Sequence, residues 1–194
     1  MKYFYLFILC YGFLARISLA QNCDTISIKK LYNEANIALS KDVTHSYTLA
    51  YKAYSQAKDC PFTKHYYEAL ISLSKAYYQK DLGDSSIQLL SPLVAKLPAN
   101  IPIIYKAGIY HQLSSGYVMT LKLELGLKFC LEALKNYELI NDSTNTTNML
   151  VNIANVYQQQ NNFKQADLYL RKAEAKAKSI SRKVALGNVY NTMG

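Results

Sequence analysis

The chain has 194 residues, of which 51% are hydrophobic and 18% are charged, and this excludes an intrinsically disordered protein. Lysine and arginine outnumber aspartate and glutamate by 22 to 13, which gives a formal net charge of +9. With only 7 glycines and 4 prolines for tight turns, the composition favours a basic, globular and mostly helical protein.

The segment 1–20 has the features of a secretory signal peptide. Lys2 precedes an apolar run over residues 3–15, and residues 18–20 supply the small side chains that a signal peptidase requires. Arg16 cuts the run short of the roughly 20 apolar residues that span a bilayer, which argues against an uncleaved anchor. We expect cleavage after Ala20 and export of the mature chain, 21–194, to the periplasm or the extracellular space.

Three cysteines remain in the mature chain, and an exported protein meets an oxidising environment. Cys23 begins the first expected helix and Cys60 follows the second. Because these two ends lie side by side in an antiparallel helix pair, we expect a disulfide between them. Cys130 lies on an apolar helical stripe, so we expect a small buried hydrophobe rather than a reactive thiol.

Apolar residues recur three or four positions apart in nine segments after the signal peptide, which is the spacing of amphipathic helices. Polar or proline-containing stretches separate these segments, including the serine-glycine stretch 114–116. No segment has the alternation of a convincing β-strand. The expected helices cover residues 26–40, 44–58, 64–80, 84–97, 101–115, 118–140, 146–160, 163–179 and 182–193.

Small and aromatic residues recur at a nearly constant spacing. Tyr157 with Ala154 recurs as Tyr190 with Gly187, and 190 − 157 gives a spacing of 33. A second set recurs at a spacing of 34, since Leu70, Leu73, Ser74 and Tyr77 are matched by Ile104, Ala107, Gly108 and His111. This pattern resembles the tetratricopeptide repeat (TPR) family, whose repeat is a helix-turn-helix of ~34 residues.

The resemblance is specific for residues 148–178 and good for 68–99, and it covers nearly the whole mature chain. Residues 101–146 fit only if about six residues are inserted into the repeat. The resemblance implies an all-α fold, an α-solenoid of antiparallel helix pairs with about 4.5 repeats over residues 21–194. Because the last expected helix lacks a partner helix, we expect the sequence to be a fragment of a longer protein.

In TPR proteins the first helices of successive repeats line a concave groove that holds an extended peptide or a partner helix. Amide side chains in such a groove can both donate and accept hydrogen bonds, which suits a peptide backbone, although an ordinary solvated face is the alternative. Asn155 and Asn188 match a position where peptide-binding members often carry asparagine. Carrying the pattern over implies these groove residues: Glu68, Lys75, Tyr78, Tyr105, Ile109, Gln112, Asn148, Asn155, Gln158, Gln159, Asn188 and Asn191.

No motif of a catalytic or cofactor site occurs in the sequence. It has no GxSxG, HExxH or glycine-rich phosphate loop, and His45, His65 and His111 fall on different repeats without the spacing of metal ligands. The basic residues are dispersed except over 171–183, which we interpret as a solvated helix face, with acidic lipid headgroups or an acidic peptide as alternatives. We expect no enzyme activity, no cofactor, no metal and no nucleic-acid partner for this fragment.

Two functions remain open at this point. The chain resembles the exported TPR segments that precede a membrane helix and a histidine kinase or DNA-binding domain in bacterial sensors. In such a protein, partner binding in the groove would bias the downstream domain. The alternative is a stand-alone periplasmic scaffold for protein assembly. The mature fragment has no candidate transmembrane helix, and one encoded downstream would favour the sensor.

Overall fold

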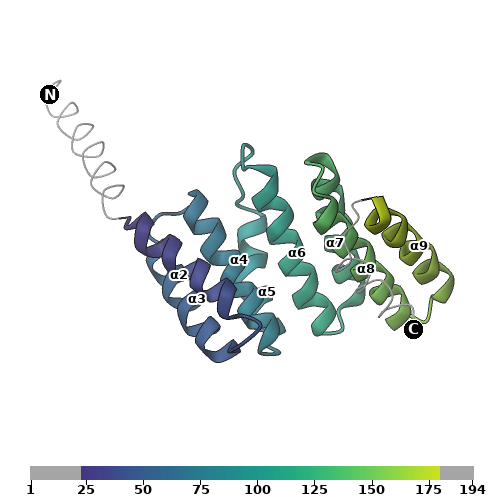
Figure 1. Ribbon diagram of the computed structural model, residues 1–194, viewed down its shortest axis with the longest axis horizontal. Helices are drawn as coiled ribbons and strands as arrows, with labels where there is room; N and C mark the ends of the chain where they lie inside the picture. Colours follow the sequence, from purple (N-terminus) through teal and green to yellow (C-terminus); the bar gives the residue numbers. More distant parts are fainter. Residues whose placement is uncertain (1–22, 180–194) are drawn as a thin grey trace, which may run out of the picture. The chain divides into compact units, whose positions relative to one another are not determined.

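A computed structural model describes residues 23–179, in which every regular element is an α-helix (Figure 1). The expected signal peptide, 1–20, and the last expected helix, 182–193, lie outside these residues. The described helices are α2 (Thr25–Ala38), α3 (Val43–Ala57), α4 (Lys64–Gln79), α5 (Gly83–Val94), α6 (Ile103–Met119), α7 (Leu123–Leu139), α8 (Ser143–Gln159) and α9 (Phe163–Ser179).

The helices belong to two compact units. Unit 1 ends at Ala76 and contains α2, α3 and most of α4, whereas unit 2 begins at Tyr77 and contains the end of α4 and helices α5 to α9. In unit 1, α2 packs against α3. In unit 2, α6 packs against α7 and α8 against α9, while α5 contacts α6 and α7 contacts α8. The predicted all-α fold of paired helices is confirmed.

Aspartate side chains begin three of the helices. Asp24, Asp42 and Asp142 each accept a hydrogen bond from a backbone N–H three residues later, at 2.9, 2.9 and 3.0 Å. These bonds satisfy amide groups that have no partner inside the helix. Helix α5 ends at Val94, three residues before its expected end and two residues after Pro92, a residue that cannot donate a helical hydrogen bond.

The repeat is longer in the described helices than the sequence pattern predicted. The buried residues of α3, α5, α7 and α9 recur at a spacing of 40, with Ser46, Ser86, Gly126 and Ala166 in one row and Ala50, Leu90, Cys130 and Leu170 in the next. The expected spacing of 34 is therefore wrong for the described helices. The six additional residues, which lengthen the spacing from 34 to 40 and were expected only for residues 101–146, are present in each described repeat, beginning with the step from α3 to α5. The spacing of 33 involves Tyr190, which lies outside the described residues.

The expected helix break at residues 114–116 is also wrong. Helix α6 continues to Met119, and the chain turns instead at Leu121, whose φ is 57°. Gly116 lies inside the helix at a close contact, because a Cβ atom there would stand 3.1 Å from the Gly83 carbonyl oxygen and 3.1 Å from Cγ1 of Ile87. The glycine therefore serves helix packing within unit 2 and does not end a helix.

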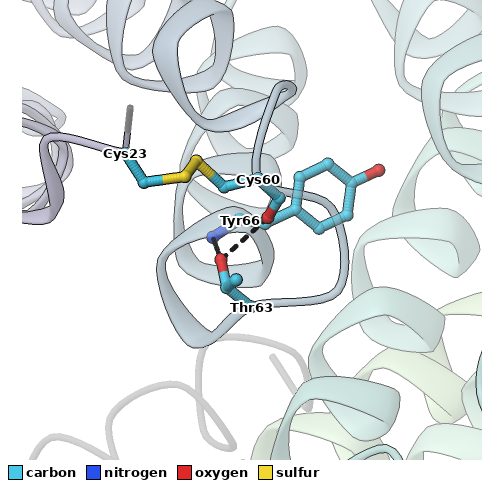
Figure 2. Close-up of a disulfide and its surroundings, with 4 residues drawn as sticks. All are labelled: Cys23, Cys60, Thr63 and Tyr66. Carbon is cyan, nitrogen blue, oxygen red and sulfur yellow. Dashed lines mark hydrogen bonds between the residues drawn. A yellow bond between two sulfur atoms is a disulfide. The ribbon is translucent and has the colours of Figure 1, made fainter. Parts of the chain in front are cut away.

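A disulfide joins Cys23 to Cys60 within unit 1 (Figure 2). The two Cα atoms are 6.2 Å apart. The Thr63 hydroxyl donates a hydrogen bond to the Cys60 carbonyl at 2.9 Å and accepts one from the Tyr66 N–H at 3.2 Å, as Figure 2 shows. The cross-link therefore joins the segment before α2 to the turn that precedes α4.

We expect Leu121→Asn to stabilise unit 2 by about 0.5–1 kcal/mol. The left-handed conformation is unfavourable for a leucine and tolerated by asparagine, which Asn141 and Asn161 show at φ values of 55° and 58°. Leu121 is 76% exposed, so little packing is lost. Denaturant unfolding measures the change, and Leu139→Asn, at an exposed helical position, is the control that should gain nothing. A less stable Leu121→Asn would contradict the expectation.

Mass spectrometry of the non-reduced protein should recover Cys23 and Cys60 in one cross-linked peptide pair and Cys130 as a free thiol. The bridge spans a sequence separation of 37, and closing such a loop restricts the unfolded chain by at most about 3–4 kcal/mol. Cys60→Ser should lower the free energy of unfolding by up to this amount. Recovery of Cys23 and Cys60 as free thiols would refute the cross-link.

Candidate functional site

A cleft of about 330 Å³ opens in unit 2. Side chains of α6 and α8 supply most of its lining, Cys130 comes from α7, and none of the lining side chains is charged. We call this site the amide cleft. It is lined by Tyr78, Ser114, Ser115, Val118, Met119, Leu121, Cys130, Asn152, Asn155 and Gln159.

Three amide side chains form the α8 side of the amide cleft. Asn152, Asn155 and Gln159 are three and four residues apart, so they project from one face of the helix. None of the three side chains hydrogen-bonds to another residue within 23–179. Each amide therefore has a donor and an acceptor available for a ligand.

The α6 side of the cleft combines hydroxyl and apolar groups. The Ser114 and Ser115 hydroxyls donate hydrogen bonds to the His111 carbonyl at 2.7 and 3.1 Å, while Val118 and Met119 offer apolar surface. Ser114 is fully buried where it lines the cleft. The lining therefore offers both hydrogen-bonding groups and a place for an apolar side chain.

Cys130 is a protonated thiol at neutral pH. Burial raises its pKa to about 11, against the opposing effect of a hydrogen bond with Ser114. The side chain is 1% exposed and forms no disulfide. These observations confirm the expectation of a small buried hydrophobe.

The structure brings some of the expected groove residues together in the amide cleft. Tyr78, Asn155 and Gln159 line it, and Tyr78 is 45% exposed. Three others are half-buried in unit 2 and do not line the cleft: Tyr105, Asn148 and Gln158. The last two, Asn188 and Asn191, lie outside the described residues.

Two residues expected in the groove are buried instead. Ile109 is 0% exposed and Gln112 is 6% exposed. The shorter family spacing misplaced them, because the spacing in the structure aligns Ile109 with the core residue Met149. The same alignment of repeats pairs Ser115 with Asn155. A search for this longer period would have found Ser115, which the sequence analysis missed along with Asn152.

The other expected groove residues, Glu68 and Lys75, belong to unit 1 and are half-buried. Burial lowers the pKa of Lys75, and the charge of Glu68 opposes this shift.

In unit 2, the His111 ring contacts Tyr137. The His111 Nδ1 lies 3.5 Å from the tyrosine hydroxyl oxygen, and the two rings meet edge to face. The histidine therefore packs against an aromatic side chain within unit 2.

Neither a metal cluster nor a membrane-spanning helix is found among the described residues. Within residues 23–179, no group of three or more histidine, cysteine, aspartate or glutamate side chains is arranged to hold a metal ion. No helix in that range combines the length and the apolar character needed to cross a bilayer.

No family model matches the sequence, and no curated protein matches it. The fold is similar to two crystal structures of a putative kinesin light chain from Podosopora anserina with nearly identical TPR-like repeats. The TM-scores are 0.64 and 0.63 at 14% sequence identity, and the matches cover 86% of this chain and 86% and 87% of theirs. The fold is that of TPR-like repeats, as the resemblance in the sequence predicted.

We expect Cys130 to react slowly with iodoacetamide in the native protein. Its raised pKa of about 11 leaves roughly 100-fold less thiolate at pH 7 than an ordinary cysteine of pKa about 9 has. The rate should rise about tenfold per pH unit up to the pKa, and denatured protein supplies the reference rate. Equal rates for native and denatured protein at pH 7 would contradict the buried, protonated state.

Proposed function

We propose that this chain is an exported TPR-like domain that binds another protein and that the amide cleft holds an extended segment of this partner. The observation that carries the proposal is the set of three amide side chains, Asn152, Asn155 and Gln159, which lack hydrogen-bond partners within residues 23–179. They lie on one face of one helix beside an uncharged lining. The proposed ligand is a peptide or an extended segment of a partner protein, and the proposed role is binding rather than catalysis.

The lining chemistry suits a peptide backbone. Each backbone unit offers one N–H donor and one carbonyl acceptor, and an amide side chain can pair with both. Val118 and Met119 supply a surface for one apolar side chain of the segment. A charged side chain in the cleft would lose hydration without gaining an opposite charge, which disfavours acidic and basic residues at that position.

Two observations support export. Residues 1–20 have the charge, apolar run and small residues of a signal peptide. The Cys23–Cys60 disulfide in unit 1 is a type of bond that persists in oxidising compartments and is rare in the cytosol. We therefore place the mature chain in the periplasm or the extracellular space.

Within this proposal the chain is the input domain of a longer bacterial signalling protein, and a periplasmic assembly scaffold is the second candidate. The resemblance to exported sensor segments favours the first. The reading frame downstream of Gly194 distinguishes them. A stretch of roughly 20 apolar residues followed by a phosphotransfer or DNA-binding domain supports the sensor, whereas a polar helix followed by a stop codon supports the scaffold.

Peptides selected by phage display against residues 21–194 should depend on the amide cleft. We expect Asn155→Ala to weaken their binding by about 2- to 10-fold, since one hydrogen bond contributes ~0.5–1.5 kcal/mol. The triple variant Asn152→Ala, Asn155→Ala and Gln159→Ala should weaken it further. Fluorescence anisotropy measures the dissociation constants.

Gln160→Ala is the matched control, because Gln160 is an exposed amide at the same end of α8 and does not line the cleft. This variant should bind like the wild type. If the triple variant binds the selected peptides as tightly as the control does, the amide cleft is not the binding site and the proposal fails.

A further inference from the structure

A second cleft, of about 570 Å³, lies in unit 1. Five of its lining residues come from α2 and two from the first turn of α4. Three of the seven side chains are lysines and none is acidic. We call this site the basic cleft, and it is lined by Thr25, Ile26, Lys29, Lys30, Asn33, Lys64 and His65.

The lysine charges in the basic cleft are largely uncompensated. Lys29 and Lys64 form no ion pair with any residue in 23–179, and Lys30 forms only a loose, exposed pair with Glu34 at 3.9 Å. Such exposed pairs contribute little to binding or stability. The cleft therefore presents a net positive charge to its surroundings.

The remaining acidic residues of α2, of α4 and of the position before α2 have partners of their own. The Asp24 carboxylate accepts the hydrogen bond from the Ser27 N–H, and the Glu68 charge acts on Lys75. Neither Asp24 nor Glu68 lines the cleft. The lining itself therefore contains lysines and no carboxylate, and the nearest acidic residues along the chain lie outside it.

Two connections hold the α2 and α4 sides of the cleft together. The Cys23–Cys60 disulfide joins the chain two residues before Thr25 to the chain four residues before Lys64. Tyr32 of α2 and His65 of α4 are also in contact, with 3.3 Å between the hydroxyl oxygen and Nδ1. The lysines therefore lie on two helices that are already joined to each other. A ligand that contacts both helices does not have to fix their relative positions when it binds.

We propose that the basic cleft binds an acidic segment of a protein partner, at a site separate in chemistry from the amide cleft. The uncompensated Lys29 and Lys64 attract carboxylates, and Asn33 adds an amide to the same lining. Ile26 is 81% exposed beside the lysines, so the segment carries an aliphatic residue next to its acidic ones. The opposite charges also accelerate the encounter of the two partners.

The test uses residues 21–194 and a short fluorescent peptide that carries glutamates around one leucine, with the same peptide bearing glutamines as its uncharged counterpart. The wild type should bind the glutamate peptide, bind the glutamine peptide far more weakly, and lose affinity as salt is raised. Lys29→Gln combined with Lys64→Gln should weaken binding of the glutamate peptide by about 3- to 30-fold.

Lys41→Gln combined with Lys52→Gln is the matched control, because it changes the net charge equally at two exposed positions outside the cleft. This control should bind like the wild type, and both double variants should still bind peptides selected for the amide cleft. The proposal is overturned if the two double variants lose equal affinity or if the glutamine peptide binds as well. Binding to phosphatidylserine vesicles without binding to the glutamate peptide overturns it in favour of a membrane surface.

Discussion

The close approach of paired helices at one recurring position is the constraint on which the rest of the structure depends. At a constant spacing the position is occupied by Ser46, Ser86, Gly126 and Ala166. In unit 1 the Ser46 hydroxyl reaches the Ala35 carbonyl of the neighbouring helix at 2.8 Å. In unit 2 a Cβ on Gly126 would stand 2.6 Å from Cγ2 of Val118, so any larger residue would force the Val118 side chain or the helices to shift. Small residues at this position let neighbouring helices pack closely and bury a shared interface, which a single helix could not form.

The amide cleft is a consequence of the same packing. Cys130 follows Gly126 by one helical turn, and the equivalent residues in α5 and α9 are Leu90 and Leu170. A cysteine is smaller than a leucine, so Cys130 leaves space that Leu90 and Leu170 fill in their own repeats of unit 2. The equivalent residue in unit 1 is the small Ala50. The cleft therefore depends on one small side chain of α7, while its amide groups come from α8.

The sequence predicted the helices well, but it predicted only some of the residues that line the candidate site. Apolar periodicity predicted all eight described helices because each buries one stripe against its neighbours. The turn after α6 was misplaced because Gly116 indicates a break in sequence, whereas in the structure it permits contact with Gly83. Ile109 and Gln112 of α6 were misplaced for a related reason, since the spacing of 40 between equivalent residues exceeds the family spacing. Of the four residues expected on α8, Asn155 and Gln159 line the amide cleft, whereas Asn148 and Gln158 do not. The basic cleft was missed because Lys29 and Lys64 are remote in sequence.

The single cross-link makes the two units differ in their response to the redox conditions around them. Unit 1 has a disulfide beside the basic cleft, whereas the cysteine of unit 2 that the structure describes is a buried thiol. A reducing environment would therefore loosen the α2 and α4 ends of unit 1 and leave the packing of unit 2 unchanged. A copy of the chain retained in a reducing compartment would keep its amide cleft, while the two sides of its basic cleft would be held by the Tyr32–His65 contact and helix packing without the cross-link.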